Sequence, residues 1–278
     1  MTKPTLIVTR PQPEAGHWVQ LLARHGVAAQ ALPLIDIGPA SNPVDKLAAE
    51  QARTQWQRYG AIMLVSANAA RFFFNKNMPL APDHQAPAAI KTRVWSPGPG
   101  TAHIAQQLGV PAQLIDQPAP DAAQFDSEAL WAQVATQVPA MAQARQSVLI
   151  VRGASDHTAD GTSPSAGGQG RGWLAQQLRA AGVAVEFVAV YERRSPQWTP
   201  TFYAKAQQHL QDGSTWLFSS SEAVMHLRNK FTPDQLAFST AIATHQRIAQ
   251  AAQNAGFIHV KQCRPSVEEV VASLESTL

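Results

Sequence analysis

Short apolar runs that are typical of strands alternate along the chain with longer runs that have helical spacing. Residues 5–9 form the first strand-like run. Between residues 14 and 25 the apolar side chains recur three and four positions apart, which is the spacing of one helix face. Gly26 closes this predicted helix, and an extended run follows over residues 27–37. A strand–helix–strand unit of this kind predicts a parallel sheet with crossover helices.

The same order continues to the end of the chain. Further strand-like runs are residues 61–65, 93–95, 148–151, 183–191, 216–218 and 241–243. Helix-like runs are residues 68–74, 173–181, 247–255 and 266–274. One more helix-like run follows residues 96–100 and ends at Leu108. The alternation therefore predicts α/β architecture throughout.

The two halves of this pattern resemble each other. Residues 6–27 match residues 149–183, residues 64–69 match 218–223, and residues 94–110 match 242–257. Each matching pair joins a strand, a small polar turn and a helix, so the chain is predicted to form two similar doubly wound parallel-sheet lobes. The alternative is that unrelated strand–helix units share these features.

Length and composition restrict the class of protein further. The chain has 278 residues, a length typical of two domains, and its hydrophobic content of 45% suits ordinary globular cores. A net charge of +3 suits an anionic ligand but does not favour nucleic acid. One cysteine, Cys263, excludes an internal disulfide and a cysteine-rich metal site. With no apolar run near the roughly 20 residues that span a bilayer, we expect a cytoplasmic protein without a membrane segment.

The residues after the predicted strands are mostly small, hydroxylic or cationic. Ligands of open parallel sheets lie outside the carboxyl ends of the strands, so these residues form the candidate binding site. Many of them also begin a helix, where unpaired N–H groups and the helix dipole favour an anion. The candidates are Arg10, Ser66, Asn68, Gly98, Thr101, Arg152, Gly153, Ser219, Ser220, Ser221 and Thr244, with Ser127 at a further helix start.

Structural roles also explain part of this set. Ser66, Ser127 and Ser219 are ordinary N-cap residues, and Gly98 suits a tight turn. No Gly-x-Gly-x-x-Gly, Walker A or Gly-x-Ser-x-Gly pattern is present, and the nine histidines lack metal-site spacing, so no metal is expected. Tyr191, at the end of a predicted strand, is either a packing anchor or a proton donor.

One segment differs from the rest of the chain. Residues 154–172 are rich in Gly, Ser, Asp and Thr and have no apolar anchor, which is typical of a surface loop. The loop follows a predicted strand, so it is either a disordered insertion or a lid over a ligand.

The predicted strand-end turns, in their order and spacing, resemble those of the uroporphyrinogen-III synthase family. The resemblance covers nearly the whole chain. The matching segments are residues 8–11, 32–35, 66–69, 98–102, 108–110, 126–130, 151–153, 170–174, Tyr191, 218–223 and 265–267.

The resemblance implies two α/β domains joined by a two-stranded linker. The linker strands would lie near residues 34–38 and 188–193. The first lobe would then combine residues 1–36 with 194–278, and the second would comprise residues 37–193.

The resemblance also implies an activity. The family converts the linear tetrapyrrole hydroxymethylbilane into uroporphyrinogen III, closing the ring and inverting the last pyrrole without a metal or organic cofactor. Tyr191 matches the family's tyrosine and is expected to assist departure of the hydroxyl group. The other candidates would hold the eight carboxylates of the substrate. Ile248 stands where the family often has threonine, so Thr244 or His245 would replace that contact.

Two other interpretations stay open. One is a non-catalytic two-lobed module that binds anions or sugars, with a regulatory role. The other is an unrelated cytoplasmic enzyme with a doubly wound fold, against which the missing phosphate loop counts. We expect a monomer, since no coiled coil or exposed apolar helix is evident.

Overall fold

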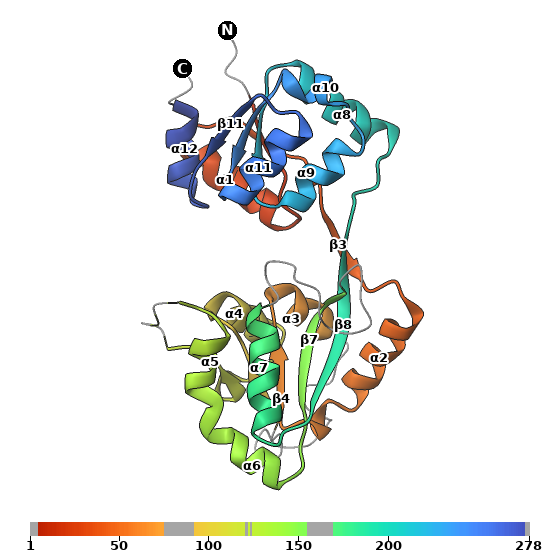
Figure 1. Ribbon diagram of the computed structural model, residues 1–278, viewed down its shortest axis with the longest axis vertical. Coiled ribbons are helices and arrows are strands. Elements are labelled where there is room, and N and C mark those ends of the chain that lie inside the picture. The colour runs from red at the N-terminus through yellow and green to blue at the C-terminus, as the bar shows by residue number, and fades with distance from the viewer. Residues whose placement is uncertain (1–4, 75–91, 120–121, 123, 155–168, 276–278) are drawn as a thin grey trace. The chain divides into compact units, whose positions relative to one another are not determined.

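The computed structural model describes residues 5–74, 92–119, 122, 124–154 and 169–275. The chain divides into two compact units (Figure 1). Unit 1 combines Met1–Ile37 with Arg193–Leu278, and unit 2 is Gly38–Glu192. Unit 1 is discontinuous in sequence because its first strands pair with strands from the C-terminal part of the chain.

The sheet of unit 1 has five parallel strands in the order β11-β10-β9-β1-β2. The strands are β1 (Leu6–Val8), β2 (Ala29–Ala31), β9 (Thr215–Phe218), β10 (Thr240–Ala243) and β11 (His259–Gln262). Val8 pairs with Leu217, and Phe218 pairs with Ala243. This register brings the residues that follow β1, β9 and β10 to one edge of the sheet.

Helices cover both faces of this sheet, so alternate residues of one strand enter different cores. Leu6 and Val8 pack with α1 (Glu14–Arg24) and α12 (Val267–Glu275). Ile7 and Trp216 belong to the opposite core, and this face is covered by α8 (Pro200–Gln211), α9 (Ser221–Arg228), α10 (Pro233–Ala237) and α11 (Gln246–Ala255). Burial on both faces explains the nearly continuous apolar runs of β1 and β9.

The sheet of unit 2 has six strands in the order β3-β8-β7-β4-β5-β6. The strands are β3 (Asp36–Pro39), β4 (Ala61–Leu64), β5 (Arg93–Trp95), β6 (Ile115–Asp116), β7 (Val148–Ala154) and β8 (Val185–Arg194). The pairs β8–β7, β7–β4, β4–β5 and β5–β6 are parallel. Their carboxyl ends therefore meet at one edge.

Two layers of helices cover the sheet of unit 2. One face carries α2 (Pro43–Thr54), α3 (Ala67–Phe73) and α4 (Pro99–Gln107), whose core includes Ile62 and Val151. The other face carries α5 (Ser127–Val134), α6 (Val138–Gln143) and α7 (Gln169–Ala180), whose core includes Met63 and Ile150. Short 3-10 turns lie at Trp56–Arg58, Ala112–Leu114 and Ala135–Gln137.

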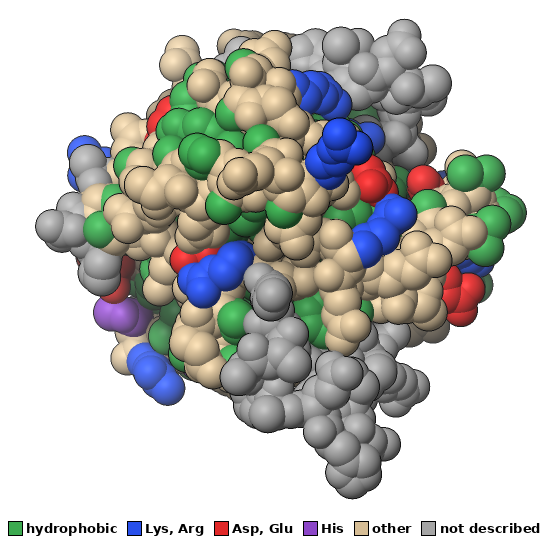
Figure 2. All heavy atoms as spheres, turned by 90° about the horizontal axis from the view of Figure 1, so that it is seen from below, with side chains coloured by type: hydrophobic (Ala, Val, Ile, Leu, Met, Phe, Trp, Pro, Cys, Tyr) green, Lys and Arg blue, Asp and Glu red, His purple; other side chains and the backbone are tan. Residues whose placement is uncertain are grey.

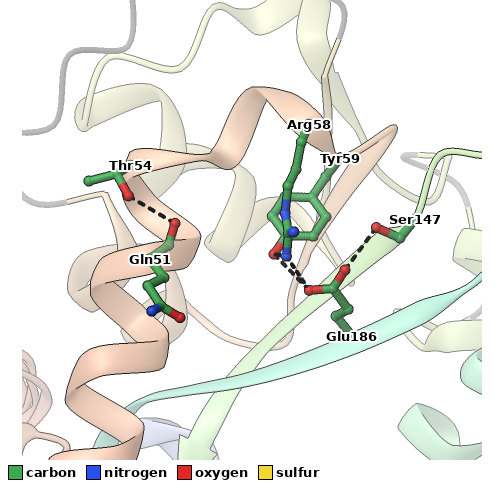
Figure 3. A network of polar contacts seen from close by, with 6 residues as sticks. All are labelled: Gln51, Thr54, Arg58, Tyr59, Ser147 and Glu186. Atoms are coloured by element: carbon green, nitrogen blue, oxygen red, sulfur yellow. Dashed lines mark hydrogen bonds and ion pairs between the residues drawn. The ribbon is translucent and has the colours of Figure 1, made fainter.

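A polar network fixes the amino-terminal edge of the sheet in unit 2 (Figure 3). Glu186 of β8 accepts hydrogen bonds from Arg58 and from the Tyr59 hydroxyl, the latter at 3.0 Å. Ser147, just before β7, donates to the other oxygen of Glu186 at 3.1 Å. Burial raises the pKa of Tyr59, which keeps its hydroxyl neutral and able to donate. The network ties β8 to its neighbours at the edge opposite the candidate binding residues.

The strands β3 and β8 are hydrogen-bonded neighbours and continue from one unit into the other. Ala40 donates its N–H to the carbonyl of Val190, and Arg194 pairs with Asp36 at 2.7 Å. The predicted fold class, two doubly wound parallel-sheet lobes joined by a two-stranded linker, is confirmed.

Two details of the prediction are wrong. The strand β7 runs to Ala154, so Arg152 and Gly153 lie within the strand and not after it. Residues 169–172 were predicted as part of a loop, but they form the first turn of helix α7, which begins at Gln169. The remainder of that predicted insertion, residues 155–168, lies outside the described residues.

The surface carries few charges. On the face drawn in Figure 2, Lys and Arg side chains are spread among uncharged polar and apolar ones. This agrees with a charged-residue content of 15%. Within the described ranges, every helix is too short or too polar to cross a membrane.

Candidate active site

The order of strands reverses at one point in the sheet of unit 2. From β4 the chain adds β5 and β6 on one side, whereas β7 and β8 lie on the other side. The helices that follow β4 and β7, namely α3 and α7, belong to cores on opposite faces. Ligands of open α/β sheets bind at the carboxyl ends of strands at such a switch point. The residues at the ends of β4 and β7 are therefore the first to consider.

Ser66 and Tyr191 meet at this switch point. Ser66 follows β4 and caps α3, and its Oγ accepts the N–H of Ala69 at 3.1 Å. The same Oγ lies 3.2 Å from the hydroxyl oxygen of Tyr191 in β8. Both residues are partly exposed.

Two further residues hold the Tyr191 ring. Phe72 of α3 stacks on it, with ring centroids 5.9 Å apart and ring planes 24° apart. A Cβ atom at Gly153 would lie 2.8 Å from two carbons of the ring, which is closer than any real contact. The structure thus places Gly153 against the tyrosine. Phe72 was not predicted, because three phenylalanines follow one another and only the fold tells which one faces Tyr191.

Arg152 lies in β7 with its guanidinium over the ring of Phe187, 5.2 Å from the centroid. Arg179 of α7 lies near the same ring, at 5.8 Å. The Nε atom of Arg152 is buried and has no hydrogen-bond partner among the described residues. A buried guanidinium N–H without a partner costs free energy and is suited to an anion.

The turn after β5 is held by Ser96. This fully buried serine donates to the carbonyl of Gly98 at 2.7 Å and accepts the Gly98 N–H at 3.3 Å. The turn sets the start of α4 and places Thr101, 8% exposed, in the first turn of that helix. Ser96 was not among the predicted site residues, although it directly follows a predicted strand.

Asn68 lies in the first turn of α3, where its side chain accepts a hydrogen bond from Arg71.

Two capping predictions need correction. Asp126, and not Ser127, caps α5, because the chain is still extended at Asp126 and its carboxylate accepts the N–H of Ala129 at 2.8 Å. Ser127 is the first helical residue and is buried. In unit 1 the cap of α9 is Ser220, and not Ser219, because the chain is still extended at Ser220.

Unit 1 has its own switch point, between β1 and β9. The chain adds β2 beside β1, whereas β9, β10 and β11 follow on the other side. Arg10 lies just after β1, with its guanidinium 3.3 Å from the carboxylate of Glu14 and 4.4 Å from the ring centroid of Trp18. Its Nε is buried and has no hydrogen-bond partner among the described residues. Arg10 is therefore positioned by helix α1, which follows it, and its Nε–H remains without a hydrogen-bond acceptor among the described residues.

The serine run after β9 divides into two roles. Ser220 Oγ accepts the N–H of Glu222 at 3.2 Å and so caps α9. The hydroxyl oxygens of Ser219 and Ser221 are buried and have no hydrogen-bond partner in the described part of the chain. Buried hydroxyls without partners are rare in native structures, and a ligand is one explanation.

This division predicts different stabilities for two alanine variants. Ser220→Ala is expected to lower the free energy of unfolding by about 1 kcal/mol, because the cap is lost. Ser219→Ala is expected to leave stability unchanged or slightly higher, since no hydrogen bond is removed. Urea unfolding of the two variants beside the unchanged protein measures both values. Equal losses would contradict this assignment.

The residues after β10 have three different environments. Thr244 is partly exposed and donates its N–H to the carbonyl of Phe218 at 3.1 Å. His245 caps α11, with Nδ1 accepting the N–H of Arg247 at 3.1 Å. Ile248 is 5% exposed and belongs to the core of unit 1. The backbone hydrogen bond of Thr244 thus places this residue beside the end of β9.

The described residues include one cysteine, Cys263. Burial raises the pKa of Cys263, which follows β11, so this thiol stays protonated at neutral pH. Within the ranges that the structure describes, His, Cys, Asp and Glu side chains form no group of three that could hold a metal ion.

Hydroxyls, arginines and helix starts at the carboxyl ends of its two sheets define a two-domain α/β protein in which each domain has a candidate anion site. The sequence profile of one family, described as uroporphyrinogen-III synthase HemD, matches residues 16–272. The chain belongs to the uroporphyrinogen-III synthase family.

Individual relatives are distant. A uroporphyrinogen-III synthase of Chlorobaculum parvum is 29% identical over 107 residues, which is 38% of this chain and 39% of the relative. The alignment therefore spans well under half of that relative. The crystal structure of uroporphyrinogen-III synthetase from Helicobacter pylori covers 99% of this chain and 100% of its own, with 15% identity and a TM-score of 0.52. A mutant synthase from Thermus thermophilus covers 98% of each chain, with 12% identity and a TM-score of 0.49.

Proposed function

We propose that this protein converts hydroxymethylbilane into uroporphyrinogen III, as a cyclizing lyase of haem biosynthesis. The hydroxyl group of the substrate leaves with a proton as water, and an azafulvenium-type cation remains. The last pyrrole closes through a spiro intermediate, which fragments and recloses with that pyrrole inverted. A proton is then lost, so the net change is loss of one water molecule.

The observation that carries this proposal is the contact between Tyr191 and Ser66 at the switch point of unit 2. A phenol hydroxyl can donate a hydrogen bond to a departing hydroxyl group. Ser66 Oγ already accepts the N–H of Ala69. If Ser66 directs its own proton to the Tyr191 oxygen, the proton of Tyr191 points to the substrate. Ser66 then orients the donor and Tyr191 donates.

The remaining candidates suit the eight carboxylates of the substrate. Buried donors without partners at Arg10, Arg152, Ser219 and Ser221 are satisfied when a carboxylate accepts from them. Gly98, Thr101, Ser127 and Asn68 in unit 2, and Ser220 in unit 1, add N–H and hydroxyl groups at helix starts. Thr244 of unit 1 adds a hydroxyl group just before the cap of α11. Holding a flexible substrate in one folded shape is the larger part of the work, because ring closure without an enzyme gives the uninverted isomer.

Incubation with freshly made hydroxymethylbilane tests the proposal. Formation of the type III isomer, separated from type I by chromatography, is the expected result. If only the type I isomer appears, at the rate seen without protein, the activity is wrong and a non-catalytic anion-binding module is the better description.

A second experiment tests the role of Arg152. Arg152→Met keeps much of the side-chain volume but removes the guanidinium, and KM is expected to rise about tenfold with kcat little changed, since one charged hydrogen bond is lost. Arg179→Met is the matched control, because it removes the other guanidinium beside Phe187. A larger effect from the control than from Arg152→Met would contradict the role of Arg152.

We further propose that the protein acts as a cytoplasmic monomer on this small molecule alone, with no nucleic-acid partner and no cofactor. Its modest net charge of +3 supports the absence of a nucleic-acid partner, because nucleic-acid binding needs a denser basic surface. Light scattering coupled to size-exclusion chromatography measures the mass. A value near twice 30.0 kDa would show a dimer.

A further inference from the structure

The strand β8 contains an irregularity directly at Tyr191. Arg152 of β7 pairs with Ala189, whereas the next residue, Gly153, pairs with Tyr191. Val190 is therefore an extra residue on β8 that has no partner on β7. Such a β-bulge bends the strand and changes the direction of a side chain, and bulges are frequent beside active sites.

The bulge decides which face of the sheet receives the tyrosine. In a regular strand, neighbouring residues point to opposite faces. Val190 is buried in the core beneath α2, α3 and α4, and Tyr191 packs against that same core. Two successive side chains thus face the same side. A regular strand would direct Tyr191 to the opposite face, away from Ser66 and Phe72.

Gly153 completes this arrangement. The three atoms nearest to a Cβ built on Gly153 all belong to Tyr191, two ring carbons at 2.8 Å and the hydroxyl oxygen at 3.2 Å. The ring cannot simply move away, because Phe72 stacks on it and Ser66 contacts its hydroxyl. Any residue with a Cβ at position 153 must therefore displace the phenol.

We propose that Gly153, with the bulge at Val190, is a positioning element that sets the place of the Tyr191 hydroxyl for the reaction. Gly153 acts through the tyrosine and holds no substrate carboxylate itself. This inference rests on the proposed role of Tyr191 as hydrogen-bond donor.

Gly153→Ala is expected to lower kcat by about a hundredfold, because a displacement of about 1 Å in a catalytic group has an effect of that size. The share of type III isomer in the product is expected to fall, while KM stays within about twofold of its original value, since no binding group is lost. Gly172→Ala is the matched control in the same unit, because a Cβ there has no neighbour within 4 Å. The control is expected to keep the original kcat.

A double-mutant cycle separates positioning from other roles. In the Tyr191→Ala background the ring is absent, so adding Gly153→Ala is expected to change neither kcat nor the midpoint of thermal unfolding. A further fall of kcat in this background would overturn the inference, because Gly153 would then act without the tyrosine. The comparison remains informative if Gly153→Ala alone fails to fold, since the double variant has room for the methyl group.

Tyr191→Phe distinguishes this inference from the proposed function. A low kcat for Tyr191→Phe, together with an unchanged kcat for Gly153→Ala, would contradict the positioning role alone. An unchanged kcat for Tyr191→Phe would show that the hydroxyl has no part in the reaction, and the positioning role would fall with it.

Discussion

Tyr191→Phe is expected to lower kcat about a hundredfold, which is the lower end of the effect of a positioned proton donor. The variant retains the ring, so its stacking on Phe72 and its fit against Gly153 are preserved. Only the hydroxyl that contacts Ser66 is removed. Because this group matters most when the substrate hydroxyl departs, product affinity is expected to change much less than kcat.

Steady-state rates with hydroxymethylbilane and a separate titration of uroporphyrinogen III measure the two quantities. Tyr203→Phe is the matched control, because Tyr203 of α8 also stacks on a phenylalanine, with centroids 4.8 Å apart, and belongs to unit 1. This control is expected to keep its activity. If Tyr191→Phe has the original kcat, or if product affinity falls as much as kcat, the donor role is wrong.

The general plan of the fold follows from the sequence for a simple reason. Strands that are buried on both faces must be largely apolar, so β1, β4 and β9 are visible as runs in which Thr215 is the one polar residue. Glycines after helices mark their ends, and Gly26, Gly182 and Gly256 all have the positive φ that favours glycine. Local chemistry thus determines these boundaries.

Other elements have weaker local signals. The strands β6 and β11 lie at the edges of their sheets and are only partly buried, so they lack an apolar run. Helix α8 was not predicted, although Thr199 caps it and Pro200 begins it. Its apolar side chains are interrupted by glutamines, and only packing against Trp216 and Phe231 in the folded unit identifies its buried face.

The sequence predicts which turns contribute to the candidate site, but it does not predict how their side chains lie relative to one another. Ser66 was identified because it follows a strand, which is a local property. The direction of Tyr191 depends on a bulge between β7 and β8, and a bulge is a relation between two strands that no single segment reveals. For the same reason Gly153 was interpreted as a ligand contact, whereas its neighbour is the tyrosine ring.

Among glycine-to-alanine substitutions at the ends of helices in unit 1, Gly256→Ala is expected to lower the free energy of unfolding the most. Gly256 ends α11 with φ of 123°, a conformation in which a side chain is strained by about 1–2 kcal/mol. A Cβ there would also lie 2.6 Å from Cα and 2.9 Å from the carbonyl oxygen of Pro233. Backbone atoms cannot rotate away, so crowding adds roughly 1–3 kcal/mol. We expect a total loss of about 3 kcal/mol in the free energy of unfolding.

Gly213→Ala provides the matched control for this variant. Gly213 also has a positive φ, 78°, and lies in unit 1, but a Cβ there has no neighbour within 4 Å. Only the backbone strain applies, so the expected loss is about 1 kcal/mol. Urea unfolding gives both losses, and hydrogen exchange of β10 and β11 shows whether the destabilised part is unit 1. Equal losses for the two variants would mean that Pro233 and α10 yield to the added methyl group, so that the contact between α10 and the end of α11 is not rigid.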